Sequence, residues 1–356
     1  MSRSDNLVIC FDVQEQYYIP QYLSIAQQLS LRGIQVIYVS HDSEFNSFGS
    51  EKVMCIPEGE NQVDFYNRLS PDWIIIGNTF QGIEKLDNSI KTALVSHGIG
   101  PKACYYTVSD TPTTVRFVEG PYRLKRLKEM YPNQKFIDTG YAKLDAAVNG
   151  EYSGLKPSDY GLDDNKKTVL YAPAFFPSSI ENFSRQFPED FSEYNILLKP
   201  HFFSLSSPKY KKQKEMLENW ALSPNVYFAK KEDVNLVPFM AIADVLISDA
   251  SSALFEFAAL DKPVVWCDFY YLRWSYRGPF KFRFRGRMDK DLYEYSDIAK
   301  HVGSYQDLKS AVESQLDNPM EYSEIRKRYT LNLSGVVDGK ASQRIADYLL
   351  QNCSAP

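Results

Sequence analysis

Hydroxyl groups and a carboxylate lie close together in ADVLISDASSALFEFAAL, residues 243–260. The first apolar run predicts a strand, Asp249, Ser251 and Ser252 predict a turn, and the second apolar run predicts a helix. Backbone N–H groups at the start of such a helix and the positive end of its dipole favour a phosphate, and serine hydroxyls add donors. The turn is therefore a candidate phosphate site. A simple helix N-cap explains the same residue types.

Glu256 is the only acid in the apolar helix that this pattern predicts. A helix that is apolar nearly all round is expected to be buried, and a buried carboxylate needs a partner. Ser252 and Glu256 are four residues apart and share a helix face. A nucleotide whose phosphates bind at the serine turn could therefore direct its ribose hydroxyls to Glu256.

Two of the four histidines follow predicted strands in opposite halves of the chain. His97 is followed by Gly98 and Gly100, which let the backbone bend and approach a ligand closely. His201 follows the strand that ends in Lys199 and Pro200. Because imidazole titrates near neutral pH, both residues are candidates for acid–base or phosphate chemistry. A purely structural role at a strand end is the alternative for each.

The other two histidines carry weaker signals. His41 also follows a predicted strand, but no glycine or motif accompanies it. His301 is expected at the surface.

Strand and helix patterns alternate along both halves of the chain and predict parallel sheets covered by helices. The first half has a helical pattern at residues 18–33, and the second half has one at 207–222. The strand candidates are residues 6–12, 34–40, 71–78, 91–98 and 135–145, and then 168–175, 194–201, 225–231, 243–249 and 262–269.

A chain of 356 residues exceeds the size at which one core usually stops growing. Residues 149–167 are rich in Gly, Pro, Ser, Asp and Lys and predict a linker. We therefore expect an α/β protein with two Rossmann-like, doubly wound domains facing a cleft. Its parts are an acceptor-side domain at 1–150, a nucleotide-donor domain at 151–335, and a C-terminal helix at 336–356 that packs back on the first domain.

Composition excludes several classes of protein. Forty basic and 45 acidic residues give a net charge of −5, so no nucleic-acid partner is expected. The five cysteines include no CxxC pair, so reduced thiols and no metal site are expected. The N-terminus does not resemble a signal peptide, and no segment has the roughly 18 apolar residues that span a bilayer. The expected location is the cytoplasm.

The strongest local charge bias lies in YYLRWSYRGPFKFRFRGRM, residues 270–288, where aromatic and basic residues are interleaved. A solvated face, a site for an anionic acceptor, and peripheral contact with anionic lipid at the inner face of the membrane all fit this pattern. The basic residues are Arg273, Arg277, Lys281, Arg283, Arg285 and Arg287.

An ordered set of motifs resembles the CDP-glycerol glycerophosphotransferase family, the primases and polymerases of teichoic-acid-type polymers. The resemblance runs from about residue 94 to 349, with Glu256 standing where the family usually has Asp. It rests on SHG, VEGPYRLKRL with TGYAKLD, VLYAPAF, LKPH, ADVLISDASSALFEFAALDKPVV and DGKASQRI.

The resemblance implies a GT-B fold and transfer of an alditol phosphate from a CDP-alditol to a hydroxyl of a glycan, lipid-linked or polyol-phosphate acceptor, with release of CMP. It implies that His97 is the base, that His201 lies near the diphosphate, and that Asp249, Ser251 and Ser252 form the phosphate loop. No cofactor is expected, since the helix N-terminus and the histidine can neutralise the phosphate charge.

Two other functions fit the same residues. A GT-B glycosyltransferase that uses a CMP-, CDP- or UDP-activated sugar would need the same phosphate turn and the same ribose acid. A non-catalytic nucleotide-binding scaffold would need neither histidine, and both are present.

Overall fold

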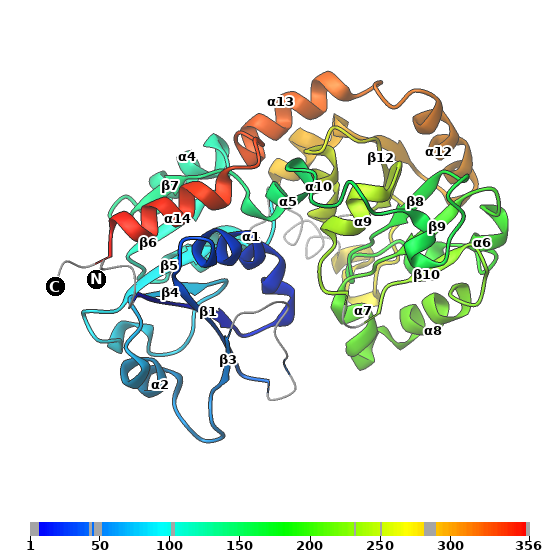
Figure 1. Cartoon of the computed structure of the whole chain (residues 1–356). Coiled ribbons are helices and arrows are strands. Elements are labelled where there is room, and N and C mark those ends of the chain that lie inside the picture. Colours follow the sequence, from blue (N-terminus) through cyan, green and yellow to red (C-terminus); the bar gives the residue numbers. More distant parts are fainter. Residues whose placement is uncertain are drawn as a thin grey trace. The chain divides into compact units, whose positions relative to one another are not determined.

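The computed structural model describes residues 7–42, 45, 52–100, 104–230, 233–249, 251–280 and 290–353. The chain folds into two compact units (Figure 1). The first consists of Met1–Ile99, Cys104–Ala146 and Leu331–Pro356, and the second of Gly100–Ala103 and Ala147–Thr330. Apart from residues 100–103, the chain passes from the first unit to the second between Ala146 and Ala147 and returns between Thr330 and Leu331, whereas the sequence predicts boundaries at positions 150 and 335.

A parallel sheet forms the centre of the first unit, with seven strands among the described residues in the order β3-β2-β1-β4-β5-β6-β7. The order reverses between β1 and β4, as in doubly wound folds, where ligands bind beyond the carboxyl ends of the strands. The strands are β1 (Val8–Val13), β2 (Gln35–Ser40), β3 (Lys52–Cys55), β4 (Trp73–Ile76), β5 (Lys91–Val95), β6 (Val115–Val118) and β7 (Phe136–Asp138).

Both faces of this sheet are buried. Alternate residues of β4 enter different clusters, with Trp73 and Ile75 in one core and Ile74 and Ile76 in the other. This is the two-residue period of a strand, and burial on both sides explains why β4 is apolar throughout.

The second unit repeats the plan with six parallel strands in its described part, in the order β10-β9-β8-β11-β12-β13. The reversal lies between β8 and β11, so the carboxyl ends of these two strands are where a ligand is expected. The strands are β8 (Thr168–Tyr171), β9 (Asn195–Leu198), β10 (Val226–Phe228), β11 (Val245–Ser248), β12 (Val264–Cys267) and β13 (Lys300–Val302).

Helices connect the strands in both units. Those of the first unit include α1 (Ile19–Ser30), α2 (Gln62–Leu69), α3 (Cys104–Thr107), α4 (Pro121–Met130) and α14 (Ala341–Gln351). Those of the second include α6 (Phe187–Asp190), α7 (Phe202–Ser206), α8 (Lys211–Trp220), α9 (Val237–Ile242), α10 (Ala253–Ala258) and α12 (Leu308–Asp317). The chain passes between the units through α5 (Asp145–Val148) and α13 (Ser323–Ser334).

The C-terminal helix α14 belongs to the first unit and packs against α1 (Figure 1). Arg32 forms an ion pair with Asp347 at 2.9 Å, and Trp73 Nε1 donates to the carbonyl of Leu349. Asp145 Oδ2 accepts from both the backbone and the hydroxyl of Ser342, at 2.6 Å each. These contacts tie the end of the chain to residues more than 190 positions earlier.

Three strands were not predicted from the sequence, and each omission has a physical reason. β3 lies at the edge of its sheet with no fully buried residue, and β13 is an edge strand of only three residues. The third, β6, has the sequence VRFV, and the charged Arg116 interrupts its apolar pattern although this side chain is only 1% exposed.

Candidate functional site

The predicted turn between strand and helix is present in the second unit, where β11 ends at Ser248 and α10 begins at Ala253. Ser248 Oγ donates to the carbonyl of Ala172 at 2.6 Å, which joins the carboxyl ends of β11 and β8. The turn therefore lies at the reversal of the strand order.

Asp249 uses its carboxylate to hold the loop that follows β8. The side chain is fully buried, and Oδ1 accepts from the backbone N–H of Ala174 at 2.6 Å. Oδ2 accepts from the backbone N–H of Ser179 at 2.9 Å and from its hydroxyl at 3.0 Å. Because both oxygens already accept hydrogen bonds from this loop, the geometry favours a bracing role for Asp249 within the turn.

The two serines differ in their environment. Ser251 Oγ accepts from the backbone N–H of Ala253 at 3.3 Å, so this hydroxyl caps the helix. Ser252 precedes the first residue of α10, has helical backbone angles and makes no capping bond with its side chain. Ser251 thus acts as a cap, and phosphate binding by the Ser252 hydroxyl stays a prediction.

Glu256 lies in α10, whose six residues are all buried, and its own exposure is 1%. Its backbone N–H donates to the carbonyl of Ser252 at 3.1 Å, so the two residues are one helical turn apart. The buried position expected from the apolar sequence is present.

His201 is the N-cap of α7, and its Nδ1 accepts from the backbone N–H of Phe203 at 3.2 Å. Its ring packs on Phe175, with the centroids 4.6 Å apart. Since Nδ1 accepts a hydrogen bond, the proton of the neutral ring lies on Nε2. His201 can therefore present an N–H donor, which suits a phosphate oxygen.

In the first unit, His97 lies two residues beyond the end of β5 and is partly buried. Aromatic rings surround its imidazole, with centroid distances of 5.3 Å to Tyr17, 5.1 Å to Tyr18 and 5.3 Å to Tyr105. The hydroxyl of Tyr141 donates to the His97 carbonyl at 3.2 Å. Gly100 has a φ of 94°, the left-handed region that favours glycine.

The basic stretch is described only in part. Arg273 packs its guanidinium over the rings of Phe176 and Tyr210, 4.5 and 4.8 Å from the centroids. Arg277 is exposed, and its Nε donates to the carbonyl of Leu272. Lys281, Arg283, Arg285 and Arg287 lie outside the described residues.

Residues 102–351 match the family of CDP-Glycerol:Poly(glycerophosphate) glycerophosphotransferase, which is more than half of the chain. The chain belongs to this family. The matched range contains His201 and the residues of the β11–α10 turn, whereas His97 precedes it.

Two relatives of this chain are named as teichoic acid enzymes. The chain is 36% identical to the teichoic acid glycerol-phosphate primase of Bacillus spizizenii over 137 residues, which are 36% of this chain and 33% of the primase. It is 24% identical to the teichoic acid glycerol-phosphate transferase of Staphylococcus aureus over 277 residues, 69% of this chain and 60% of the transferase. The matches thus span one third to three fifths of those relatives.

Solved structures support the fold. The wall teichoic acid polymerase TagF superimposes with a TM-score of 0.71 at 15% identity, covering 99% of this chain and 91% of that chain. A UDP-GlcNAc 2-epimerase from Neisseria meningitidis reaches a TM-score of 0.59 at 14% identity, with 97% and 100% covered. Together with the two parallel sheets, these likenesses confirm the expected fold of GT-B type.

A buried polar network in the first unit was missed by the sequence analysis. The carboxylate of Asp12, in β1, is fully buried and accepts from the hydroxyl of Tyr66 at 2.7 Å and from the amides of Gln14 and Gln62 at 2.8 Å. His41 Nε2 lies 3.6 Å from Asp12 Oδ1, which gives this histidine a partner that its sequence context did not suggest. Only the pairing of β1 with β2 brings the two residues together.

Stability is expected to depend on pH through His41. Its interaction with the Asp12 carboxylate outweighs partial burial and raises the pKa of the imidazole. Stability from this pair is therefore present below about pH 6.5, the unfolded-state pKa of histidine, and is lost as pH rises through the folded-state pKa. We expect His41→Gln to cost up to about 1 kcal/mol at pH 5.5, since the ring is partly exposed, and less at pH 8.5. Urea unfolding of both proteins measures this, and equal differences at the two pH values would contradict it.

Neither a metal-binding cluster nor a membrane-spanning helix is found among the described residues. Within them, no group of three or more His, Cys, Asp and Glu side chains could hold a metal ion. Nor does any helix in this part of the chain have the length and apolarity to cross a bilayer.

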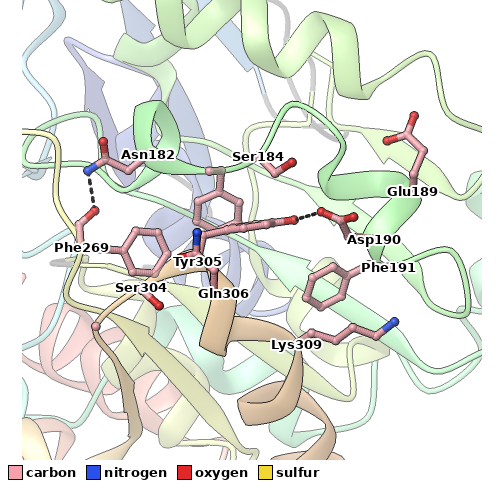
Figure 2. Close-up of a pocket in the computed structure, with 12 residues that line it drawn as sticks. Asn182, Ser184, Glu189, Asp190, Phe191, Phe269, Ser304, Tyr305, Gln306 and Lys309 are labelled. Atoms are coloured by element: carbon pink, nitrogen blue, oxygen red, sulfur yellow. Dashed lines mark hydrogen bonds between the residues drawn. The ribbon is translucent and has the colours of Figure 1, made fainter.

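A pocket of about 1020 Å³ lies elsewhere on the second unit, between the loop after β8 and the start of α12 (Figure 2). Its walls include the rings of Phe183, Phe269 and Tyr305, and the Tyr305 hydroxyl donates to Asp190 at 2.7 Å. None of the residues predicted to bind the donor lines it. This pocket is thus separate from the β11–α10 turn.

Proposed function

We propose that this chain transfers an alditol phosphate, with glycerol phosphate as the first candidate, from a CDP-alditol to a hydroxyl of a glycan, lipid-linked or polyol-phosphate acceptor. The family match over residues 102–351 is the observation that carries the proposal. Relatives named as a teichoic acid primase and a teichoic acid transferase support a role in the synthesis of such surface polymers.

In the proposed reaction, the acceptor oxygen attacks the phosphorus next to the glycerol. A new P–O bond forms to the acceptor, the bond to the bridging oxygen breaks, and that oxygen leaves with its electron pair as part of CMP. His97 accepts the proton of the acceptor hydroxyl, because a base with a pKa near the working pH is efficient.

The second unit would bind the donor. His201 would donate through Nε2 to a phosphate oxygen, and Ser252 would donate through its hydroxyl, since preorganised donors stabilise the charge that develops on phosphates. Asp249 would keep the β8 loop and the turn in place, and Glu256 would accept hydrogen bonds from the ribose. Supporting these roles, His201 has Nδ1 occupied as an acceptor and Ser252 makes no capping bond.

We propose that the reaction needs no metal ion, because the helix N-terminus and His201 can neutralise the charge on the phosphates, so activity in EDTA is expected. We further propose that the enzyme acts at the inner face of the membrane, where its acceptor is anchored. Exposed Arg277 could contribute to contact with anionic lipid.

CMP release tests the function directly. The protein is incubated with CDP-glycerol, CDP-ribitol or UDP-GlcNAc, each with and without a polyglycerol-phosphate acceptor, and the nucleotide products are separated by chromatography. We expect CMP from a CDP-alditol only when acceptor is present. Turnover of UDP-GlcNAc without any release of CMP would instead identify a glycosyltransferase, and binding without turnover would identify a scaffold.

Glu256→Gln is expected to raise the Kd for CDP-glycerol by roughly 10-fold, because a hydrogen bond to a charged group contributes about 1.5 kcal/mol or more. The free energy of unfolding should change less, since glutamine keeps the size of the side chain. Calorimetric titration with CDP-glycerol and urea unfolding measure the two effects. An unchanged Kd in a destabilised protein would mean that Glu256 is structural.

A further inference from the structure

A buried ion pair lies next to the turn that carries His97. Glu119 follows β6, Arg123 lies in the first turn of α4, and each is 2% exposed. Arg123 Nη1 contacts Glu119 Oε1 within the ion pair. Burying two charges costs free energy that the attraction between them often does not offset. Stability alone therefore does not explain why the pair lies here.

The same guanidinium holds both sides of His97. Arg123 Nη1 donates to the hydroxyl of Ser96 at 3.0 Å and lies 3.2 Å from the carbonyl of Gly98. Ser96 Oγ in turn donates to the Gly98 carbonyl at 3.1 Å. Residues 96 and 98 are therefore fixed by one nitrogen, and the backbone of His97 lies between them.

Arg123 also supports one of the rings that contact the imidazole. Its Cζ lies 4.8 Å from the centroid of the Tyr105 ring, and that ring packs at 5.3 Å against His97. A guanidinium over an aromatic face is attracted by the ring electrons. Through Tyr105, Arg123 thus restrains the imidazole as well as the backbone.

A second buried arginine adds to the free energy that is needed to bury this cluster of charges. Arg116, in β6, is 1% exposed and donates through Nη2 to the carbonyl of Tyr105 at 2.9 Å. Burial, followed by the nearby charge of Arg123, lowers the pKa of Arg116 to about 9. Two guanidiniums and one carboxylate are thus packed around the residues that define the position of His97.

We infer that Arg123, held by Glu119, is a positioning residue that fixes the Ser96–Gly98 turn and the imidazole of His97 for proton transfer. This inference rests on the proposed function, in which His97 is the base. The ion pair does not touch the donor in this scheme, so its loss should affect the chemical step and leave donor affinity nearly unchanged.

Arg123→Lys tests the inference while keeping the charge. A lysine ammonium is a point charge and cannot reproduce the planar set of donors. We expect kcat to fall by about 10- to 100-fold, since a small displacement of a catalytic group has effects of this size, and KM for CDP-glycerol to stay within about twofold. The matched control is Arg126→Lys on the same helix, whose guanidinium packs over Tyr106 at 4.0 Å. It should retain kcat within about twofold.

A spectroscopic measurement separates positioning from general destabilisation. With four histidines in the chain, the imidazole signals are few, and loss of one signal in His97→Gln assigns His97. Arg123→Lys should shift or broaden the His97 signal more than the other three. Unchanged kcat together with an unmoved His97 signal would overturn the inference.

The two proposals can fail separately. If the wild-type protein releases no CMP from any CDP-alditol, the proposed function fails, while a selective change of the His97 signal in Arg123→Lys would still support positioning. If the wild type is active and Arg123→Lys lowers stability without lowering kcat, the positioning role fails and the function stands.

Discussion

Replacing His97 with glutamine is expected to lower kcat for acceptor-dependent CMP release from CDP-glycerol by about 10²- to 10⁴-fold, the usual contribution of a general base. Glutamine cannot accept a proton at neutral pH, but it preserves a polar side chain of similar length. The Kd for CDP-glycerol should stay within about twofold, because the proposed donor contacts lie on other residues.

The measurement is single-turnover CMP release with saturating donor, combined with calorimetric titration of CDP-glycerol. His41→Gln is the matched control, since His41 also follows a strand of the first sheet, at the end of β2. It should retain kcat within about twofold. Near-normal turnover by His97→Gln would show that another group removes the proton.

Asp249→Ala is expected to destabilise the protein by about 3 kcal/mol or more, because each buried donor left without an acceptor costs about 1–3 kcal/mol. The substitution removes the acceptor for the backbone N–H groups of Ala174 and Ser179 and for the Ser179 hydroxyl. Urea unfolding, with Asp249→Asn as a milder variant, measures the loss.

Asp244→Ala provides the comparison at the other end of β11. Asp244 accepts from the backbone N–H of Thr168 at 2.8 Å, but its side chain is 31% exposed, so water can replace the carboxylate. A loss of about 1 kcal/mol is expected there. Similar losses for Asp244→Ala and Asp249→Ala would contradict the bracing role of Asp249.

The β11–α10 segment could be predicted from sequence because all of its signals are local. An apolar strand, a turn of small polar residues and an apolar helix follow each other within 18 residues, and the structure has these elements in that order. The same holds for the second sheet, five of whose strands match predicted segments. Local patterns suffice when both faces of a strand are buried, since the whole strand is then apolar.

The role of Asp249 could not be predicted in the same way. The sequence predicts that Asp249 belongs to a phosphate loop. In the structure, its two carboxylate oxygens accept hydrogen bonds from a loop 70 to 75 residues earlier. Hydrogen bonds of this range depend on which strands become neighbours, and β8 and β11 are adjacent only because of the sheet order.

The sequence alone determined the α/β class, most of the strands, the family and a short set of candidate residues, because periodicity and ordered motifs are properties of neighbouring positions. Only the tertiary structure joined Asp12 to His41, braced the β8 loop with Asp249 and fixed the His97 turn with Arg123. The physical reason is that the role of a buried charge depends on the groups that surround it. The fold brings these groups together from distant parts of the chain.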